Sequence, residues 1–160
     1  AITLKFPGFA RRFPLLKKPA ISLLKKLVYQ DQVNAFLEKN REAKGFGFVD
    51  AVLNYFNFGY AVSAEHRAKI PTTGRVVIIA NHPIGSLDVL SIVRLVGEVR
   101  SDVRIVANDM LAHFEGLREL IIPLDNMCGQ SKLAGVRRSI RAVIEDLANE
   151  EAIKVFPSGE

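Results

Sequence analysis

The chain has 160 residues and a single cysteine, Cys128, so it is long enough for one domain with a hydrophobic core and cannot form an internal disulfide. Hydrophobic residues make up 49% of it and charged residues 24%, which excludes a disordered chain. The longest uncharged run, from Ala51 to Ala64, is shorter than the roughly 20 apolar residues of a transmembrane helix. No spacing of histidine and cysteine typical of a zinc site occurs, so we expect no metal.

The net charge of +5 is concentrated at the N-terminus, where residues 1–44 contain ten Lys or Arg and three Asp or Glu. Phenylalanine and leucine alternate with the basic residues there, and a helix is predicted from about Pro19 to Phe36. This mixture suits the surface of an anionic membrane, whereas an ordinary amphipathic helix packed on its own domain is the alternative. We expect no nucleic-acid partner, because no known nucleic-acid-binding signature accompanies the charge.

After residue 44 the sequence is predicted to alternate between helices and strands. Predicted helices cover residues 48–56, 87–96, 108–117 and 132–149, and predicted strands cover residues 60–63, 76–80, 104–107, 120–124 and 153–156. This alternation is typical of an α/β domain whose largely parallel sheet is flanked by helices. We therefore predict a basic amphipathic helical segment over residues 1–44 and an α/β domain over residues 45–160.

The strand predicted at 76–80 contains no charge and is rich in β-branched residues, so we expect it to be buried on both faces. In the strand predicted at 120–124, Pro123 indicates an edge position or a strand end. Polar pairs follow the predicted strands at residues 81–82, 108–109 and 125–126, and Pro157 to Glu160 follow the last one. If the strands are parallel, these groups share one edge and form one site, although a polar turn explains the pairs at 108 and 125 equally well.

The turn after the strand at 76–80 carries the strongest chemical pattern. Asn81 and His82 are followed by Pro83 and Gly85, and Ser86 is predicted to cap a helix with Asp88 in its first turn. A histidine one turn from a carboxylate fits a general base and its orienting partner, although a histidine held in the core is an alternative. A serine hydrolase using Ser86 with His82 is disfavoured, because the Gly-x-Ser-x-Gly motif is absent.

Asn81-His82-Pro83 with Asp88, followed by Phe156-Pro157-Ser158-Gly159-Glu160, resembles the first and third sequence blocks of the glycerolipid acyltransferases. The middle block would be Pro123-Leu124-Asp125-Asn126. The similarity extends from about Phe46 to the end and is nearest to the haemolysin-like bacterial branch. It implies an enzyme of lipid metabolism, in phospholipid biosynthesis, that transfers an acyl group from acyl carrier protein or CoA to a lysolipid or glycerol phosphate hydroxyl.

In the mechanism that this resemblance implies, His82 is the general base and Asp88 holds its other ring nitrogen. Gly85 would let the backbone approach the reacting carbonyl, and neither a metal nor a cofactor is required. We expect the substrates to contact Asn81, Gly85, Ser86, Asp125, Asn126, Arg137, Arg138, Pro157, Ser158 and Gly159. Arg137 and Arg138, with Arg141, are candidate anion contacts, and a solvated helix face explains them equally well.

The sequence departs from the family pattern in three places. Five residues separate His82 from Asp88, where four are usual, and Asn126 stands where the middle block has arginine, which weakens the case for a bare phosphate acceptor. Ser158 and Glu160 stand where glutamate and threonine are usual.

We expect the protein to be peripheral on the cytoplasmic face of the inner membrane, held there by residues 6–26. A non-catalytic membrane-surface module is the competing interpretation of that segment. Because Glu160 falls inside the third block, we also expect the chain to be the N-terminal part of a longer protein.

Overall fold

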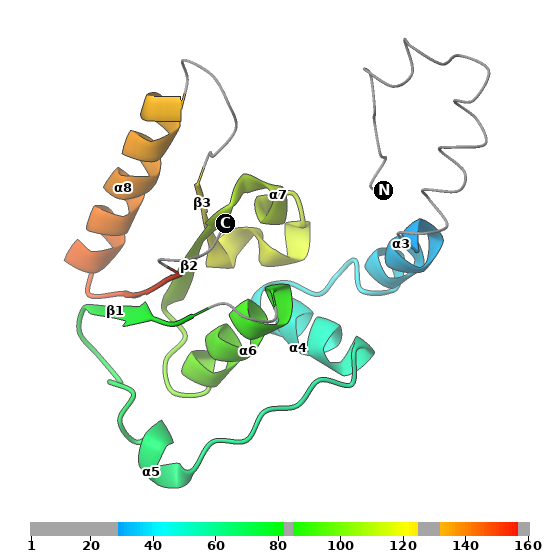
Figure 1. Cartoon of the computed structure of the whole chain (residues 1–160), viewed down its shortest axis with the longest axis horizontal. Coiled ribbons are helices and arrows are strands. Elements are labelled where there is room, and N and C mark those ends of the chain that lie inside the picture. Colours follow the sequence, from blue (N-terminus) through cyan, green and yellow to red (C-terminus); the bar gives the residue numbers. More distant parts are fainter. Residues whose placement is uncertain (1–28, 82–84, 125–131, 157–160) are drawn as a thin grey trace. The chain divides into compact units, whose positions relative to one another are not determined.

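A computed structural model describes residues 29–81, 85–124 and 132–156 (Figure 1). The chain divides into two compact units, residues 1–41 and 42–160. In the first unit the structure describes helix α3 (Gln30–Lys39), in which no residue is buried. The helix expected from Pro19 to Phe36 therefore lies partly outside the described residues, and its described part ends three residues later than expected. Within the described ranges, no helix is long and apolar enough to cross a membrane.

The second unit contains a sheet of four parallel strands. These are β1 (Val76–Ile79), β2 (Val103–Asn108), β3 (Ile121–Leu124) and β4 (Ala152–Val155), arranged in the order β1-β4-β2-β3. In the register, Ile79 lies opposite Val155, and Ile105 lies opposite both Lys154 and Ile121. The predicted α/β class with a parallel sheet is thus confirmed.

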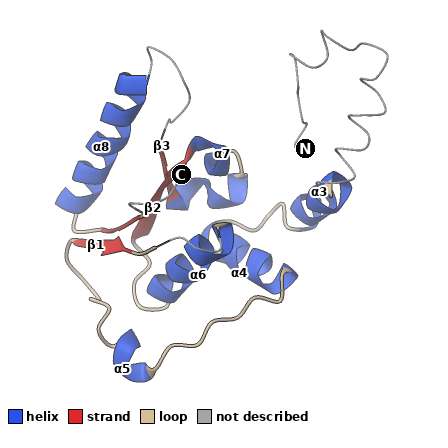
Figure 2. Cartoon of the chain, viewed as in Figure 1, coloured by secondary structure: helices blue, strands red, loops and turns tan. Residues whose placement is uncertain are grey.

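Helices cover both faces of this sheet (Figures 1 and 2). On one face lie α4 (Gly45–Tyr55) and α6 (Ser86–Gly97), and on the other lies α8 (Lys132–Ala148). The strand order explains this, because the connection from β1 to β2 crosses the sheet in one direction and that from β3 to β4 returns. Right-handed crossovers in opposite directions place their helices on opposite faces. The short elements are α5 (Ala64–Arg67), α7 (Asp109–Ala112) and the 3-10 helix η1 (Glu115–Leu120).

The main core lies between the sheet and the helices α4 and α6. In α6, Val89, Val93 and Val96 recur at intervals of three and four residues, so they share the buried side of the helix. In α4, Phe48 and Val49 are buried as well. The face under α8 is fixed by an ion pair between Arg104 of β2 and Asp146 of α8, at 2.8 Å.

Arg100 joins three chain segments at the amino edge of the sheet. Its guanidinium makes two 2.7 Å hydrogen bonds to the Asp102 carboxylate, just before β2. It also donates to the carbonyl of Gly74, before β1, at 2.9 Å and to that of Glu150, before β4, at 2.8 Å. One buried side chain therefore aligns the starts of three strands.

Two predicted strands differ from the structure. Residues 60–63 form a loop, in which the Tyr60 hydroxyl donates to Glu98 at 2.8 Å and no strand partner is present among the described residues. β1 is an edge strand rather than one buried on both faces, since Val77 is 50% exposed and Ile79 is 68% exposed. The helix α8 contacts β3 and β4, so no helix in the described ranges covers the same face of β1. The prediction of an edge position for Pro123 is confirmed, because β3 is the other edge of this sheet.

Two helix starts and ends also differ. Ser86 is the first residue of α6 rather than its cap, and Gly85 occupies the cap position without a side-chain hydrogen bond. The helix expected over residues 108–117 stops at Ala112, and η1 follows it. At η1, Gly116 lies directly against the ring of Phe48, so the chain follows the shape of α4 there.

Candidate functional site

The carboxyl ends of all four strands lie at one edge of the sheet, because every pair is parallel. At this edge β1 continues into Asn81, β2 ends at Asn108, β3 ends at Leu124, and β4 continues into Phe156. In open α/β sheets, ligands bind outside this edge. The polar residues that follow the strands therefore begin from a common edge.

The connection from β1 to α6 carries the predicted base. His82, the predicted general base, lies outside the described residues, between the exposed Asn81 and Gly85. Gly85 has φ 89°, a conformation that side chains with a Cβ rarely adopt, and no atom lies within 4 Å of the position a Cβ would take. The glycine is therefore required by the backbone conformation and not by lack of space.

Asp88 lies in the first turn of α6, at the end of the helix nearest to the strand ends. Its backbone N–H donates to the carbonyl of Gly85 at 3.1 Å, and its side chain is half-buried. A carboxylate in this position is stabilised by the helix dipole and is suited to orienting an imidazole. In the described part of the chain, no three His, Cys, Asp or Glu side chains gather as a metal site.

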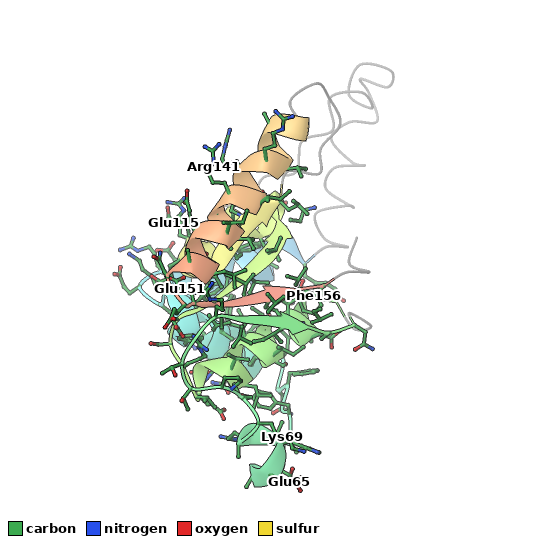
Figure 3. The ribbon with its side chains drawn as sticks, turned by 90° about the vertical axis from the view of Figure 1, so that its left-hand side faces the viewer. Glu65, Lys69, Glu115, Arg141, Glu151 and Phe156 are labelled. Atoms are coloured by element: carbon green, nitrogen blue, oxygen red, sulfur yellow. The ribbon has the colours of Figure 1, made fainter. Side chains whose placement is uncertain are left out.

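The other predicted site residues are placed as follows. Ser86 is exposed at the first position of α6. Arg137 and Arg138 are exposed on α8, as is Arg141 (Figure 3). Because α8 lies on the opposite face from α6, the structure does not bring these arginines to Asp88, and their role stays a prediction. The remaining predicted residues lie outside the described ranges: Asp125, Asn126, Pro157, Ser158 and Gly159.

An apolar cavity of about 250 Å³ lies on the α6 side of β1. From β1 its walls include Val76 and Ile78, and from α6 they include Ile92 and Leu95. Toward the amino edge of the sheet it is also lined by Arg100. Ile92 is four residues after Asp88 and therefore on the same side of the helix. Sequence patterns did not indicate this cavity, because they predict which residues are apolar but not where packing leaves space.

Lys154, in the interior strand β4, is a second feature that the sequence analysis missed. Its side chain is 0% exposed, and burial lowers its pKa from 10.5 to about 8. The ammonium lies 4.1 Å from the centre of the Phe156 ring and donates to the carbonyl of Val155 at 3.2 Å. The sequence did contain one indication of this buried charge, namely a lysine among the apolar residues of Ala152–Val155.

The family model of the acyltransferases matches residues 1–160, and the chain therefore belongs to the acyltransferase family. The relatives that it resembles are lipid enzymes, so the resemblance to a lipid acyltransferase family is confirmed. A lyso-glycine lipid O-acyltransferase of Phocaeicola vulgatus is 27% identical over 150 residues, which are 93% of this chain and 51% of that protein. One of the same name from Bacteroides thetaiotaomicron is 27% identical over 123 residues, 76% of this chain and 44% of that protein. The chain thus spans about half the length of these relatives, and no solved structure matches it.

Proposed function

We propose that this chain carries the catalytic site of a lipid O-acyltransferase that moves a fatty acyl group from a thioester to the hydroxyl of a lysolipid. The observation that carries the proposal is the connection from β1 to α6 at the carboxyl edge of the sheet. In the sequence, Asn81-His82-Pro83 follows this strand after Ala80, and Asp88 lies in the first turn of the helix, in a chain of the acyltransferase family. The names of the two relatives support O-acylation of a lysolipid.

In the proposed reaction His82 accepts the proton of the acceptor hydroxyl while its oxygen attacks the thioester carbonyl. The new C–O bond forms, the C–S bond breaks, and the proton passes from the imidazolium to the departing thiolate. Asp88 holds the ring and stabilises its charged form without taking the proton. The donor is acyl carrier protein or CoA carrying the acyl group, and the reaction needs no metal or cofactor.

The cavity between β1 and α6 supports the proposal because its wall suits an acyl chain. Its lining is mostly aliphatic, and it begins one helical turn beyond Asp88. For the acceptor, asparagine at position 126 in place of arginine favours a lysolipid without a bare phosphate. Lyso-glycine lipid and lysophosphatidic acid are therefore the two acceptors to compare.

The membrane is part of the same proposal, since acceptor and product are lipids. The basic and aromatic residues of 6–26 would hold the enzyme at the cytoplasmic face of the inner membrane. These residues lie outside the described ranges.

The test measures loss of acyl thioester and gain of diacylated product with each acceptor, using acyl-CoA and acyl carrier protein in parallel. His82→Ala is expected to abolish transfer, because it removes the proton acceptor. Asp88→Asn is expected to reduce kcat severely but less completely, because the imidazole loses its orienting partner. The matched control is His66→Ala, since His66 is exposed on the short helix α5.

Wild-type turnover by folded His82→Ala would refute the assignment of the base. Ser86→Ala separates the proposal from a serine hydrolase. A hydrolase would release free fatty acid without the acceptor and would lose all activity in the Ser86→Ala variant. The proposed transferase would still transfer the acyl group to the acceptor in that variant.

A further inference from the structure

Lys154 is a buried charge that the proposed reaction does not use. It lies in β4 between β1 and β2, opposite Ile78 on one side and Ile105 on the other. Because residues in register share a face of the sheet, its side chain starts on the face covered by α6, where Ile78 lines the cavity. It is the largest fully buried side chain in the described ranges.

This ammonium has little to compensate for the water that it lost. No described carboxylate forms an ion pair with it, and its contacts are the Val155 carbonyl and the Phe156 ring. Removing a cation from water costs free energy unless a partner compensates. An apolar side chain at this position would therefore stabilise the sheet more than the lysine does. The lysine is therefore difficult to explain as packing alone.

The two contacts restrain Val155 and Phe156, at the carboxyl end of β4. Val155 is the last residue of β4, and Phe156 follows it at the carboxyl edge of the sheet (Figure 3). A cation over an aromatic face restrains the ring, and the hydrogen bond restrains the neighbouring peptide group. Together they hold the Phe156 ring and the last peptide group of β4 in one arrangement.

We propose that Lys154 is a positioning residue, which holds the Phe156 ring in place at the carboxyl edge of the sheet, where the acyl-transfer site is proposed. The proposal rests on the proposed function, since it concerns turnover at that site. Lys154 touches no substrate in this role. Its removal should therefore lower kcat with little change in KM, because groups displaced by even 1 Å lose roughly 100-fold in rate.

The test compares Lys154→Met, Phe156→Leu and the double variant in the full-length enzyme. Each single variant is expected to lower kcat roughly 10- to 100-fold, and the double variant is expected to lose no more than either one, because both remove the same contact. Lys154→Arg should restore part of the rate, since a guanidinium also stacks on aromatic rings. Lys44→Met, at an exposed lysine before α4, is the matched control and should keep the wild-type kcat.

Wild-type kcat in Lys154→Met, or fully additive losses in the double variant, would overturn the proposal. A second measurement does not depend on activity. Hydrogen exchange at the Phe156 amide and the ring resonances of Phe156 should both change in Lys154→Met and remain unchanged in Lys44→Met. If the enzyme shows no acyl transfer at all, the proposed function fails, while unchanged exchange and ring resonances refute the positioning role independently.

Discussion

At the scale of single residues, Arg100 shows how one buried side chain holds the amino edge of the sheet together. The side chain is 3% exposed, and the Asp102 carboxylate beside it is 43% exposed. Hydrogen bonding to Asp102 raises the pKa of Arg100, and Arg100 in turn lowers the pKa of Asp102. The contribution of this pair to stability is therefore present above the ordinary pKa of Asp102 and is lost as the pH falls through its lowered folded-state value.

We expect Arg100→Met to destabilise the protein by about 3 kcal/mol, because it leaves three backbone carbonyls and a partly buried carboxylate without their donor. Urea unfolding at neutral pH measures the change. The matched control is Arg118→Met, whose side chain is 69% exposed and pairs with Glu115 only at 3.7 Å. Its expected effect is below about 0.5 kcal/mol, so equal losses in both variants would contradict the role given to Arg100.

Lys154 should change how the free energy of unfolding depends on pH. Its folded pKa of about 8 lies below the ordinary 10.5, so between these values the unfolded chain binds the extra proton. The free energy of unfolding should therefore rise with pH from about 8 to 10.5. Outside that window Lys154 should not contribute to its dependence on pH. In Lys154→Met the rise should be smaller by the contribution of one group, as measured by urea unfolding at pH 7, 9 and 10.5. Identical slopes in both proteins would show that the pKa of Lys154 is not lowered.

At the scale of elements, the packing of α4 on η1 depends on a glycine. A Cβ at Gly116 would lie within 3 Å of the buried Phe48 ring, so Gly116→Ala must displace that ring. We expect a loss of about 1–3 kcal/mol, measured by thermal and urea unfolding. Gly47→Ala is the control within α4, because no atom lies within 4 Å of its Cβ position, and it should be neutral or slightly stabilising.

The cavity between α6 and β1 gives a second prediction for an element. Ile92→Trp should fill part of its volume and shift the preference of the enzyme toward shorter acyl chains, with turnover of short chains maintained. Competition between acyl donors of different length measures the shift. Ile144→Trp is the control, since Ile144 is exposed on α8, across the sheet. An unchanged preference in Ile92→Trp would remove the cavity from the acyl site.

The elements that the sequence predicted well are those whose pattern is local. The apolar positions of α8 and the runs of β-branched residues in β1, β2 and β4 lie within a few residues of their predicted bounds. The predictions failed where distant neighbours decide the outcome. Among the residues that the structure describes, the segment at 60–63 has no strand partner, and one face of β1 is not covered because α8 lies over β3 and β4.

The same distinction applies to the site. Asp88 was correctly expected in the first turn of a helix after the strand, because turn residues and helix starts are encoded locally. The burial of Lys154 and the cavity beside Ile92 depend on how α6 packs on the sheet. Sequence periodicity carries no information about that packing.

At the scale of the whole molecule, the proposed reaction requires that the enzyme bind the membrane. We expect the full chain to sediment with vesicles that contain anionic lipid and a chain lacking residues 1–26 to bind them much less. Each lysine or arginine near the surface contributes about 1 kcal/mol, so raising the salt concentration should release the full chain. Neutral vesicles are the control. Binding that is unchanged by the truncation or by salt would contradict the prediction.

The strand order also determines when the sheet can be completed. β1 is the first strand of the sheet, and its partner there is β4, with Val76 opposite Ala152, 76 positions later. β2 and β3, by contrast, pair Ile105 with Ile121, only 16 positions apart. On the ribosome, at about 5–20 residues per second, β1 would wait roughly 4–15 s with its apolar side chains unpaired. We expect the β2–β3 pair to form before β4 joins β1 to β2, so the carboxyl edge should be completed last. A ribosome-bound chain that has not yet made β4 would therefore lack the strand that joins β1 to β2, however much of its core had already formed.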